Sequence, residues 1–399
     1  MKSKLMILGA SILQLPAIEQ AVEMGLQVIA VDMNPEAVGF QVPGVIREVI
    51  STIDIPAIVE AAKRHQIDGI MTLATDMPMR SVAAVAEAMN LIGISSETAV
   101  KATNKAEMRK ALKAANVPVP AFFKVSDVEQ YREAAGQFRG PFVVKPADSS
   151  GSRGIYLVKD ITDTEDIERA YRHSRPHSRG GDVVVEEYMT GPEVSVETLT
   201  VNGECHVIQI TDKITTGAPH FVEMGHTQPS RLADPVKKQI AEVAKAANRA
   251  IGIENGPSHT EIIVTAEGPK IVELGARLGG DCITTHLVPL STGVNMVRSC
   301  IQIALGQVPD VMPKYKKVSA IRYFAQHSGV VKSITGVEEA RKIPGVKQIS
   351  IVHGVGETVT EITSSGDRMG FVVVQADSMD EVTAALDQVK STIAIAIES

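Results

Sequence analysis

Residues 257–277 read PSHTEIIVTAEGPKIVELGAR, in which two apolar strands flank a short turn. A three-residue hairpin loop favours glycine at its last, left-handed position. Gly268 stands at that position if the loop is Ala266–Gly268. This register predicts that Thr265 pairs with Pro269.

The same register places Glu261 directly opposite Glu273. Because side chains alternate across a strand, both glutamates share one face, and Arg277 lies toward the same side. Like charges opposed on a sheet destabilise it, so the carboxylate pair must take up a proton or bind a cation. Mg²⁺ prefers one or two carboxylates together with phosphate oxygens and water, which suits such a pair. The alternative is a solvated hairpin whose glutamates face water.

A second segment, residues 141–154, reads PFVVKPADSSGSRG. An apolar strand with one lysine, Lys145, leads into a loop rich in serine and glycine. Glycines let the backbone approach a ligand closely, and the loop N–H and hydroxyl groups are donors for phosphate oxygens. The alternative is a flexible hairpin loop.

A third segment, residues 183–197, reads VVVEEYMTGPEVSVE and breaks between two strands. The break exposes backbone donors and acceptors to which an adenine edge would pair, while Glu193 would accept the ribose hydroxyls. An acidic strand end is the alternative interpretation.

Length and composition limit the classes of protein to which this chain can belong. A length of 399 residues suggests two to four structural units, and 44% apolar residues suffice for a sizeable core. The net charge of −7 has no basic run or stripe, which argues against a nucleic-acid partner. No apolar run reaches the ~18 residues of a membrane span. Three cysteines, an odd number without metal-ligand spacing, predict free thiols and a cytoplasmic location.

Along the chain, strands and helices alternate in residues 1–100, which predicts a small doubly wound parallel sheet. Residues 101–120 are expected to form a linker helix that ends at the two prolines Pro118 and Pro120. Residues 121–310 mix strands with polar helices, and residues 311–399 form a last α+β part. The expected fold class is therefore α/β and α+β.

In order and spacing, these segments and the Asn104-Lys105 helix start resemble the ATP-grasp superfamily, from Lys4 to about Gly306. The resemblance implies a pre-ATP-grasp parallel sheet, an ATP-grasp fold over residues 121–310, and a small mixed C-terminal domain. Within the ATP-grasp part, a lid would span about 121–187 and a second subdomain about 188–310. The amino-acid sequence of residues 256–281 is most similar to that of the L-amino acid ligases.

The resemblance also implies roles for individual residues. The ATP-binding set would be Lys105, Lys145, Ser149, Ser150, Gly151, Ser152, Gly154, Glu186, Glu187, Tyr188, Met189 and Glu193. Glu261 and Glu273 would bind Mg²⁺, or Mn²⁺ in its place. Lys145 and Arg277 would be catalytic, Arg277 by steadying negative charge on the phosphoryl group and on the later tetrahedral intermediate. Many relatives have an asparagine metal ligand where this chain has Gly275, and a water would replace it.

The reaction so implied is the ADP-forming ligation of a small carboxylate to an amine, through an acyl phosphate. The polar segment Thr211–Arg231 is expected to form part of the acceptor-substrate wall, with Glu223, His226 and His259 as the candidate substrate residues. The C-terminal part would close the site or form a homodimer contact. Small-molecule substrates are the expected partners, with no nucleic acid and no membrane.

Three other functions compete with this one. Purine-biosynthesis members such as phosphoribosylglycinamide synthetase and the carboxylases of aminoimidazole ribonucleotide share the architecture and are the nearest competitors. A nucleotide-binding protein without turnover is opposed by the presence of both lysines, both glutamates and Arg277. An NAD-dependent oxidoreductase lacks its phosphate fingerprint, because the first turn, Gly9–Gln14, has no G-x-G-x-x-G spacing.

Overall fold

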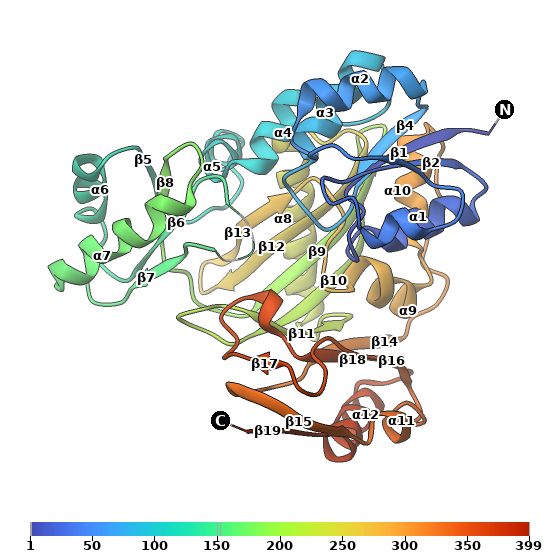
Figure 1. Ribbon diagram of the computed structural model, residues 1–399. Helices are drawn as coiled ribbons and strands as arrows, with labels where there is room; N and C mark the ends of the chain where they lie inside the picture. Colours follow the sequence, from blue (N-terminus) through green and yellow to red (C-terminus); the bar gives the residue numbers. More distant parts are fainter. Residues whose placement is uncertain (1, 150, 152, 399) are drawn as a thin grey trace.

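The N-terminal part is a four-stranded parallel sheet covered by helices on both faces (Figure 1). The computed structural model describes residues 2–149, 151 and 153–398. The strands lie in the order β3-β2-β1-β4. Their bounds are β1 (Lys4–Leu8), β2 (Gln27–Val31), β3 (Ile46–Glu48) and β4 (Gly69–Thr72), and the helices of this part are α1 (Leu15–Glu23), α2 (Ile55–His65) and α3 (Met79–Met89).

Alternate residues of β1 enter two different cores, which is what a doubly wound sheet requires. Met6 and Leu8 belong to the core that contains residues of α2 and α3. Leu5 and Ile7 belong to the core that contains residues of α1 and α10 (Met296–Ala304). The predicted parallel sheet is confirmed.

The connection to the next part is two helices, α4 (Ser96–Thr103) and α5 (Lys105–Ala114), so the single helix expected there is wrong. Asn104 ends α4 and caps α5, because its Oδ1 accepts hydrogen bonds from the N–H groups of Ala106 and Glu107 at 3.0 and 3.1 Å. The expected helix start at Asn104-Lys105 is confirmed, and it places Lys105 in the first turn of α5.

A small antiparallel sheet, β5-β8-β6-β7, projects to one side of the molecule (Figure 1). Its aromatic core includes Tyr131, Phe138 and Phe142. The elements are β5 (Phe122–Val125), α6 (Val128–Ala135), β6 (Phe142–Pro146), β7 (Tyr156–Val158), α7 (Thr164–Ser174) and β8 (Val183–Glu187). We call this sheet with its two helices the lid.

An eight-stranded sheet in the order β13-β12-β9-β10-β11-β14-β18-β16 forms the centre of the molecule. Five of its strands precede residue 310 and three follow it, so the last part of the chain extends the central sheet. The first five are β9 (Glu193–Val201), β10 (Glu204–Thr215), β11 (Glu223–Gln228), β12 (Gly256–Thr265) and β13 (Gly268–Gly275), and the helices here are α8 (Asp234–Ile251), α9 (Val288–Thr292) and α10.

The last part of the chain also has a three-stranded sheet, β17-β15-β19, at the lower edge of Figure 1. Its elements are β14 (Val318–Tyr323), β15 (Gly329–Thr335), α11 (Val337–Ala340), β16 (Val346–Ile351), β17 (Thr358–Val359), β18 (Gly370–Ala376), α12 (Met379–Thr392) and β19 (Ala394–Glu398). Together the sheets confirm the expected mixed α/β and α+β class. Among the described helices, none combines the length and the apolar character needed to cross a membrane.

The hairpin β12–β13 differs from its expected register at the turn but not at the glutamates. Thr265 pairs with Gly268, so the loop has two residues and the expected pairing of Thr265 with Pro269 is wrong. A bulge between the Ile262 and Glu261 pairs then restores the offset, and Glu261 does lie opposite Glu273.

Candidate active site

The two glutamates of the hairpin lie on one face of the central sheet, each with a lysine as its counter-ion. Lys105 Nζ lies 2.7 Å from Glu273 Oε1, and Lys213 Nζ lies 3.0 Å from Glu261 Oε1. Among the described residues, no group of three or more acidic, histidine or cysteine side chains is arranged to hold a metal ion. The hairpin therefore offers two carboxylates, as the glycine at position 275 implies.

Lys213 of β10 is the centre of an acidic cluster. Its ammonium lies 2.7 Å from Glu193, 3.0 Å from Glu261 and 3.3 Å from Glu223, and its side chain is 5% exposed. Burial lowers the pKa of Lys213, but the three carboxylates outweigh burial and raise it well above its ordinary value. Burial raises the pKa of Glu261, while Lys213 and His259 bring it well below its ordinary value. Lys213 and Glu261 are therefore both charged at neutral pH.

Lys105 connects the hairpin to the serine-rich loop of the lid. Its ammonium donates to Ser149 O at 2.7 Å as well as to Glu273. Gly151 and Gly154 of the same loop have positive φ angles, and a Cβ on Gly154 would lie 2.7 Å from His177 Cβ. Ser150 and Ser152, also predicted to bind ATP, lie outside the described residues.

Lys145 of β6 is held by a buried carboxylate that sequence reasoning had assigned to the adenine site. Glu186 Oε2 lies 2.6 Å from Lys145 Nζ, and the same carboxylate accepts from Arg109 Nε at 2.7 Å and from its Nη2 at 3.2 Å. Burial raises the pKa of Glu186, but Arg109 and Lys145 lower it to about 2. The Glu186 side chain thus fixes Lys145 and joins α5 to the lid.

The three residues after Glu186 leave the lid at its edge. Glu187 N–H donates to Ala121 O at 2.9 Å, and Tyr188 N–H donates to Pro141 O at 3.1 Å. The ring of Tyr188 lies 6.4 Å from that of Phe221, and Met189 is half-buried. This segment borders the same region of the molecule as Glu193, which begins β9.

His259 of β12 is a buried cation. Its Nδ1 lies 2.6 Å from Glu197 Oε1, and its Nε2 lies 3.5 Å from Glu261 Oε1. Burial lowers the pKa of His259, but Glu197, Glu261 and their hydrogen bonds outweigh it and raise the pKa to about 9. His259 is therefore the predicted substrate residue that lies beside Glu261, one of the two opposed glutamates.

His226 and Glu223, the other two predicted substrate residues, lie on β11 beside a residue from the last part of the chain. His226 Nε2 lies 3.2 Å from Asp281 Oδ2, whose carboxylate also receives Arg368 Nη1 and Nη2 at 2.9 and 2.8 Å. Arg368 Nη1 donates to Glu223 O at 3.1 Å, and the guanidinium lies 3.7 Å from the centre of the Tyr323 ring. Burial raises the pKa of Asp281, but His226 and Arg368 lower it overall.

Arg277 reaches the site from the turn after β13, where the first sheet meets the central sheet. Its Nε and Nη2 donate to Asp76 Oδ1 and Oδ2 at 2.8 and 3.1 Å. Burial lowers the pKa of Arg277, but Asp76, Glu273 and Glu197 raise it overall.

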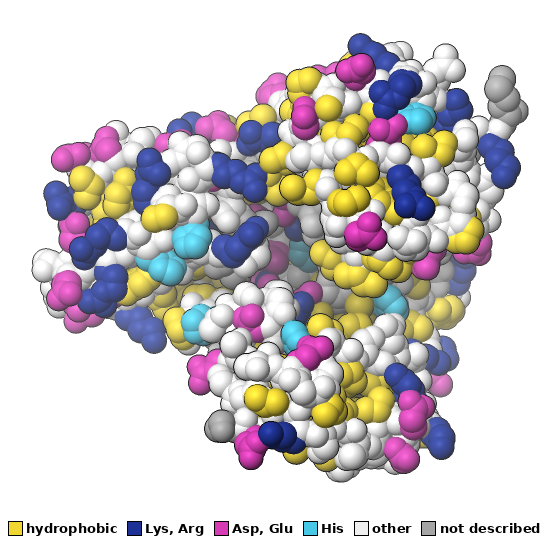
Figure 2. Space-filling view, in the orientation of Figure 1, with side chains coloured by type: hydrophobic (Ala, Val, Ile, Leu, Met, Phe, Trp, Pro, Cys, Tyr) yellow, Lys and Arg dark blue, Asp and Glu magenta, His cyan; other side chains and the backbone are white. Residues whose placement is uncertain are grey.

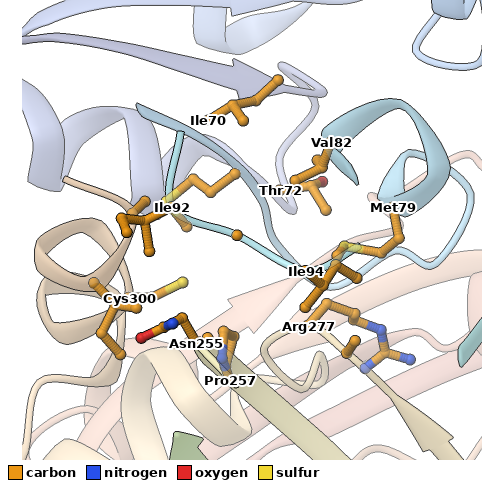
Figure 3. A pocket seen from close by; sticks show the side chains of 16 residues that line it. Ile70, Thr72, Met79, Val82, Ile92, Ile94, Asn255, Pro257, Arg277 and Cys300 are labelled. Carbon is orange, nitrogen blue, oxygen red and sulfur yellow. The ribbon is translucent and has the colours of Figure 1, made fainter. Parts of the chain in front are cut away.

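A cavity of about 40 Å³ lies behind Arg277 (Figure 3). It is lined mainly by apolar side chains such as Ile94 and Cys300, and the Arg277 guanidinium points away from Cys300. Figure 2 shows a hollow at the centre of the molecule, bordered by the N-terminal part, the lid and the C-terminal part, with acidic, basic and histidine side chains in its depth. The polar groups therefore gather at the meeting point of all three parts.

The residues of this region that were not among the predicted site residues include Asp76, Arg109, Lys213 and Arg368. Lys213 stood in the polar segment Thr211–Arg231, which was the available signal. The other three pair with residues between 77 and 201 positions away. Nothing local in the sequence marks such partners.

Two family models match the chain. The ATP-grasp domain matches residues 138–285, and the L-amino acid ligase C-terminal domain 2 matches residues 322–398. The chain therefore has an ATP-grasp domain joined to an L-amino acid ligase C-terminal domain, in agreement with the resemblance to the ATP-grasp superfamily. The second match covers a part of the chain that carries no chemical motif recognisable from the sequence.

Relatives agree with both matches. The chain is 28% identical to an L-arginine-specific L-amino acid ligase of Bacillus subtilis over 309 residues, which cover 76% of this chain and 74% of that protein. The fold is similar to that of an L-amino acid ligase from Bacillus licheniformis, with a TM-score of 0.84 at 24% identity over 100% of this chain and 99% of the other. It is also similar to phosphoribosylglycinamide synthetase from Anaerococcus prevotii, with a TM-score of 0.81 at 22% identity and full coverage of both chains.

Proposed function

We propose that this protein uses ATP to activate the carboxylate of an amino acid, or of a similar small acid, and joins it to an amine. The observation that carries the proposal is the face of β12 and β13, where Glu261 and Glu273 lie opposite each other, each paired with a lysine, and Arg277 follows four residues later. This arrangement collects the charges that a phosphoryl transfer needs.

The lysine–carboxylate pairs fit a magnesium nucleotide. Lys105, Lys145 and Lys213 each contact at least one glutamate. When Mg-ATP binds, the lysines would exchange carboxylates for phosphate oxygens, and Glu261 and Glu273 would exchange lysines for the metal. The exchange keeps the charges of Glu261 and Glu273 paired. Mg²⁺, or Mn²⁺, would supply neutralisation of the phosphate charge.

The other ATP contacts would come from the lid and from the start of β9. Ser149, Gly151 and Gly154 belong to the loop that would lie over the phosphates, and Glu193 would accept the ribose hydroxyls. Because the N–H groups of Glu187 and Tyr188 already donate within the protein, the adenine edge would meet carbonyl groups of this segment or the amide of Met189.

The chemistry would then need only positioning and charge. A carboxylate oxygen of the substrate attacks the γ-phosphorus of ATP, and ADP leaves, with Lys145 and Lys105 holding the phosphate oxygens. The amine next attacks the acyl carbon, loses a proton and expels phosphate. Arg277 would stabilise the oxyanion of that step. Glu223, His226 and His259 border the space for the two substrates.

The first turn of the parallel sheet favours an amino acid over a phosphoribosyl substrate. Ala10 N–H donates to Asp32 Oδ2 at 2.8 Å, and Asn34 N–H donates to Asp32 Oδ1 at 2.9 Å. A carboxylate thus occupies backbone donors that a phosphate would need, and its charge repels an anion. This observation supports the ligase over its purine-biosynthesis competitor.

The test is ADP and phosphate release with Mg-ATP across amino acids, alone and in pairs, with glycine plus phosphoribosylamine in parallel and Glu273→Ala as control. Release that requires two amino acids is the expected result. Phosphate release only with the purine precursor would instead support a role in nucleotide biosynthesis. No phosphate release with any substrate would favour a nucleotide-binding protein without turnover. Light scattering at the same concentrations tests the expected homodimer.

A further inference from the structure

The ion pair between Arg277 and Asp76 joins two distant parts of the chain at the site. Asp76 follows β4 of the first sheet and lies 201 residues before Arg277. Both side chains are 15% exposed, and the pair is bidentate. Arginine pairs of this geometry fix orientation as well as charge, because two parallel bonds prevent rotation of the guanidinium.

The pair leaves one edge of the guanidinium for other partners. Nε and Nη2 of Arg277 are used by Asp76, whereas Nη1 makes a 3.3 Å hydrogen bond to Leu278 O. Nη1 carries two N–H groups, so the second of them can donate to a developing negative charge without breaking the ion pair. Asp76 thus determines which edge of Arg277 remains available to a substrate.

Gly275 provides the space for Asp76. A Cβ atom on Gly275 would lie 2.8 Å from Asp76 Oδ1 and 3.2 Å from Arg277 Cζ. The first distance is below any ordinary contact, so a side chain at position 275 requires the Asp76 carboxylate to shift from its position against Arg277. Gly275, which stands where the expected pattern has a metal ligand, therefore lies beside the Asp76–Arg277 ion pair. The hydrogen atom of glycine leaves room for the Asp76 carboxylate.

We propose that Asp76 is a positioning residue that orients Arg277 for the transfer reaction, and that Gly275 is glycine because it admits the Asp76 carboxylate. This inference rests on the proposed function, in which Arg277 stabilises charge. Asp76 acts through Arg277, and the first sheet thereby contributes to catalysis by orienting a group on the central sheet.

The test is a double-mutant cycle of Asp76→Ala and Gly275→Ala, measured by phosphate release with a productive substrate pair. Each single variant is expected to lower kcat by about 10- to 100-fold while the KM for ATP stays within about twofold, because misplacement of a charged group costs the chemical step. In the Asp76→Ala background, Gly275→Ala should change kcat by less than about twofold, since the new methyl group no longer meets a carboxylate.

Two control variants separate this effect from general damage. Gly280→Ala lies in the same turn, where a Cβ would have ordinary contacts of 3.6 Å and beyond. Glu168→Gln removes one partner of an exposed arginine pair in the lid. Both should keep kcat within about twofold.

Additive losses for Asp76→Ala and Gly275→Ala would overturn the role given to Gly275. A raised KM for ATP at unchanged kcat in Asp76→Ala would overturn the positioning role. The same cycle measured by thermal unfolding needs no substrate, so it tests the contact even if wild type is silent with every substrate. Silence of that kind would count against the proposed function instead.

Discussion

The lysines of the site and its arginines hold their carboxylates in different ways. Each lysine meets glutamate oxygens through a single ammonium nitrogen, and Lys213 shares its charge among three glutamates. Each of three arginines instead donates hydrogen bonds to both oxygens of a single carboxylate. The pairs are Arg109–Glu186, Arg277–Asp76 and Arg368–Asp281.

The difference follows from the shapes of the two cations. An ammonium is a point charge that exchanges one anionic partner for another, whereas a guanidinium matches the two oxygens of a carboxylate in one orientation. In the proposed function, a bound nucleotide would displace carboxylates from the lysines. Arginines stand where separate parts of the chain must keep a fixed relation.

Lys213→Met would give the largest loss of stability. It leaves the half-buried Glu193, Glu223 and Glu261 without the buried cation that they share, and removal of one partner of a buried ion pair costs up to about 3–5 kcal/mol of unfolding free energy. Urea unfolding measures the loss. Because the proposed Mg²⁺ would supply a cation to Glu261, it should stabilise the variant more than wild type.

The exposed Lys238→Met is the matched control and should unfold like wild type. Equal stabilisation of wild type and Lys213→Met by Mg²⁺ would contradict the exchange of lysine for metal.

Arg277→Lys tests the guanidinium itself, because it keeps the charge and removes the second point of contact with Asp76. Loss of one oriented donor to a developing oxyanion lowers kcat by about 10²–10³. Phosphate release measures it, with the exposed Arg132→Lys as control. Activity within tenfold of wild type would show that charge alone suffices at this position.

The pKa of His259 predicts a loss of stability at alkaline pH. The folded-state pKa of about 9 exceeds the ordinary value of 6.5, so the stabilising contribution is complete below pH 6.5 and is lost as the pH rises through 9. In that window the unfolding free energy should fall by on the order of 1 kcal/mol per pH unit. The groups facing the ring are Glu197, Glu261 and Arg277.

His259→Gln, which cannot be protonated in this range, should remove that part of the pH dependence in urea unfolding between pH 6.5 and 9.5. An unchanged slope in the variant would assign the dependence to another group.

Arg368→Lys should have a smaller effect, because Asp281 keeps His226 as a partner and stays near a cation. Asp281 and Cys282 have φ angles of 50° and 60°, a conformation that non-glycine residues adopt at a cost. Weaker anchoring of Asp281 should lower the unfolding free energy by about 1–2 kcal/mol. It should also raise the KM of the acceptor more than that of ATP, and an equal rise for both would contradict its place on the substrate side.

The arginine pairs also mark the limit of what the sequence could predict. Apolar runs predicted the strands, and the place of Gly268 in the turn predicted that Glu261 lies opposite Glu273, because these patterns are local. Even there, the opposition of Glu261 and Glu273 depended on a shorter loop and a bulge that offset each other. Bulge positions depend on how β12 also pairs with β9, which residues 257–277 do not contain.

Asp76 and Arg368 could not be predicted for a different reason. Their partners are brought to them by the packing of the first sheet against the central sheet and by the pairing of β18 within the central sheet, and neither residue stands in a motif. Glu186 illustrates the same limit. Its position in the chain suggested the adenine site, but α5 lies against the lid and places Arg109 on its carboxylate.

The smallest effect is expected for a substitution that changes neither a lysine nor an arginine, in the cavity behind Arg277. Val82 of α3 lines this space of about 40 Å³, which is too small for a side chain but has room for one added methyl group. Val82→Ile should therefore raise the unfolding free energy by about 0.5–1 kcal/mol, since a buried methylene contributes about that much. Urea unfolding measures the gain, and kcat should stay unchanged because the Arg277 guanidinium points away from the apolar lining around Cys300 (Figure 3). A gain in stability accompanied by a fall in kcat would mean that the packing behind Arg277, and not only its pair with Asp76, sets the orientation of this arginine.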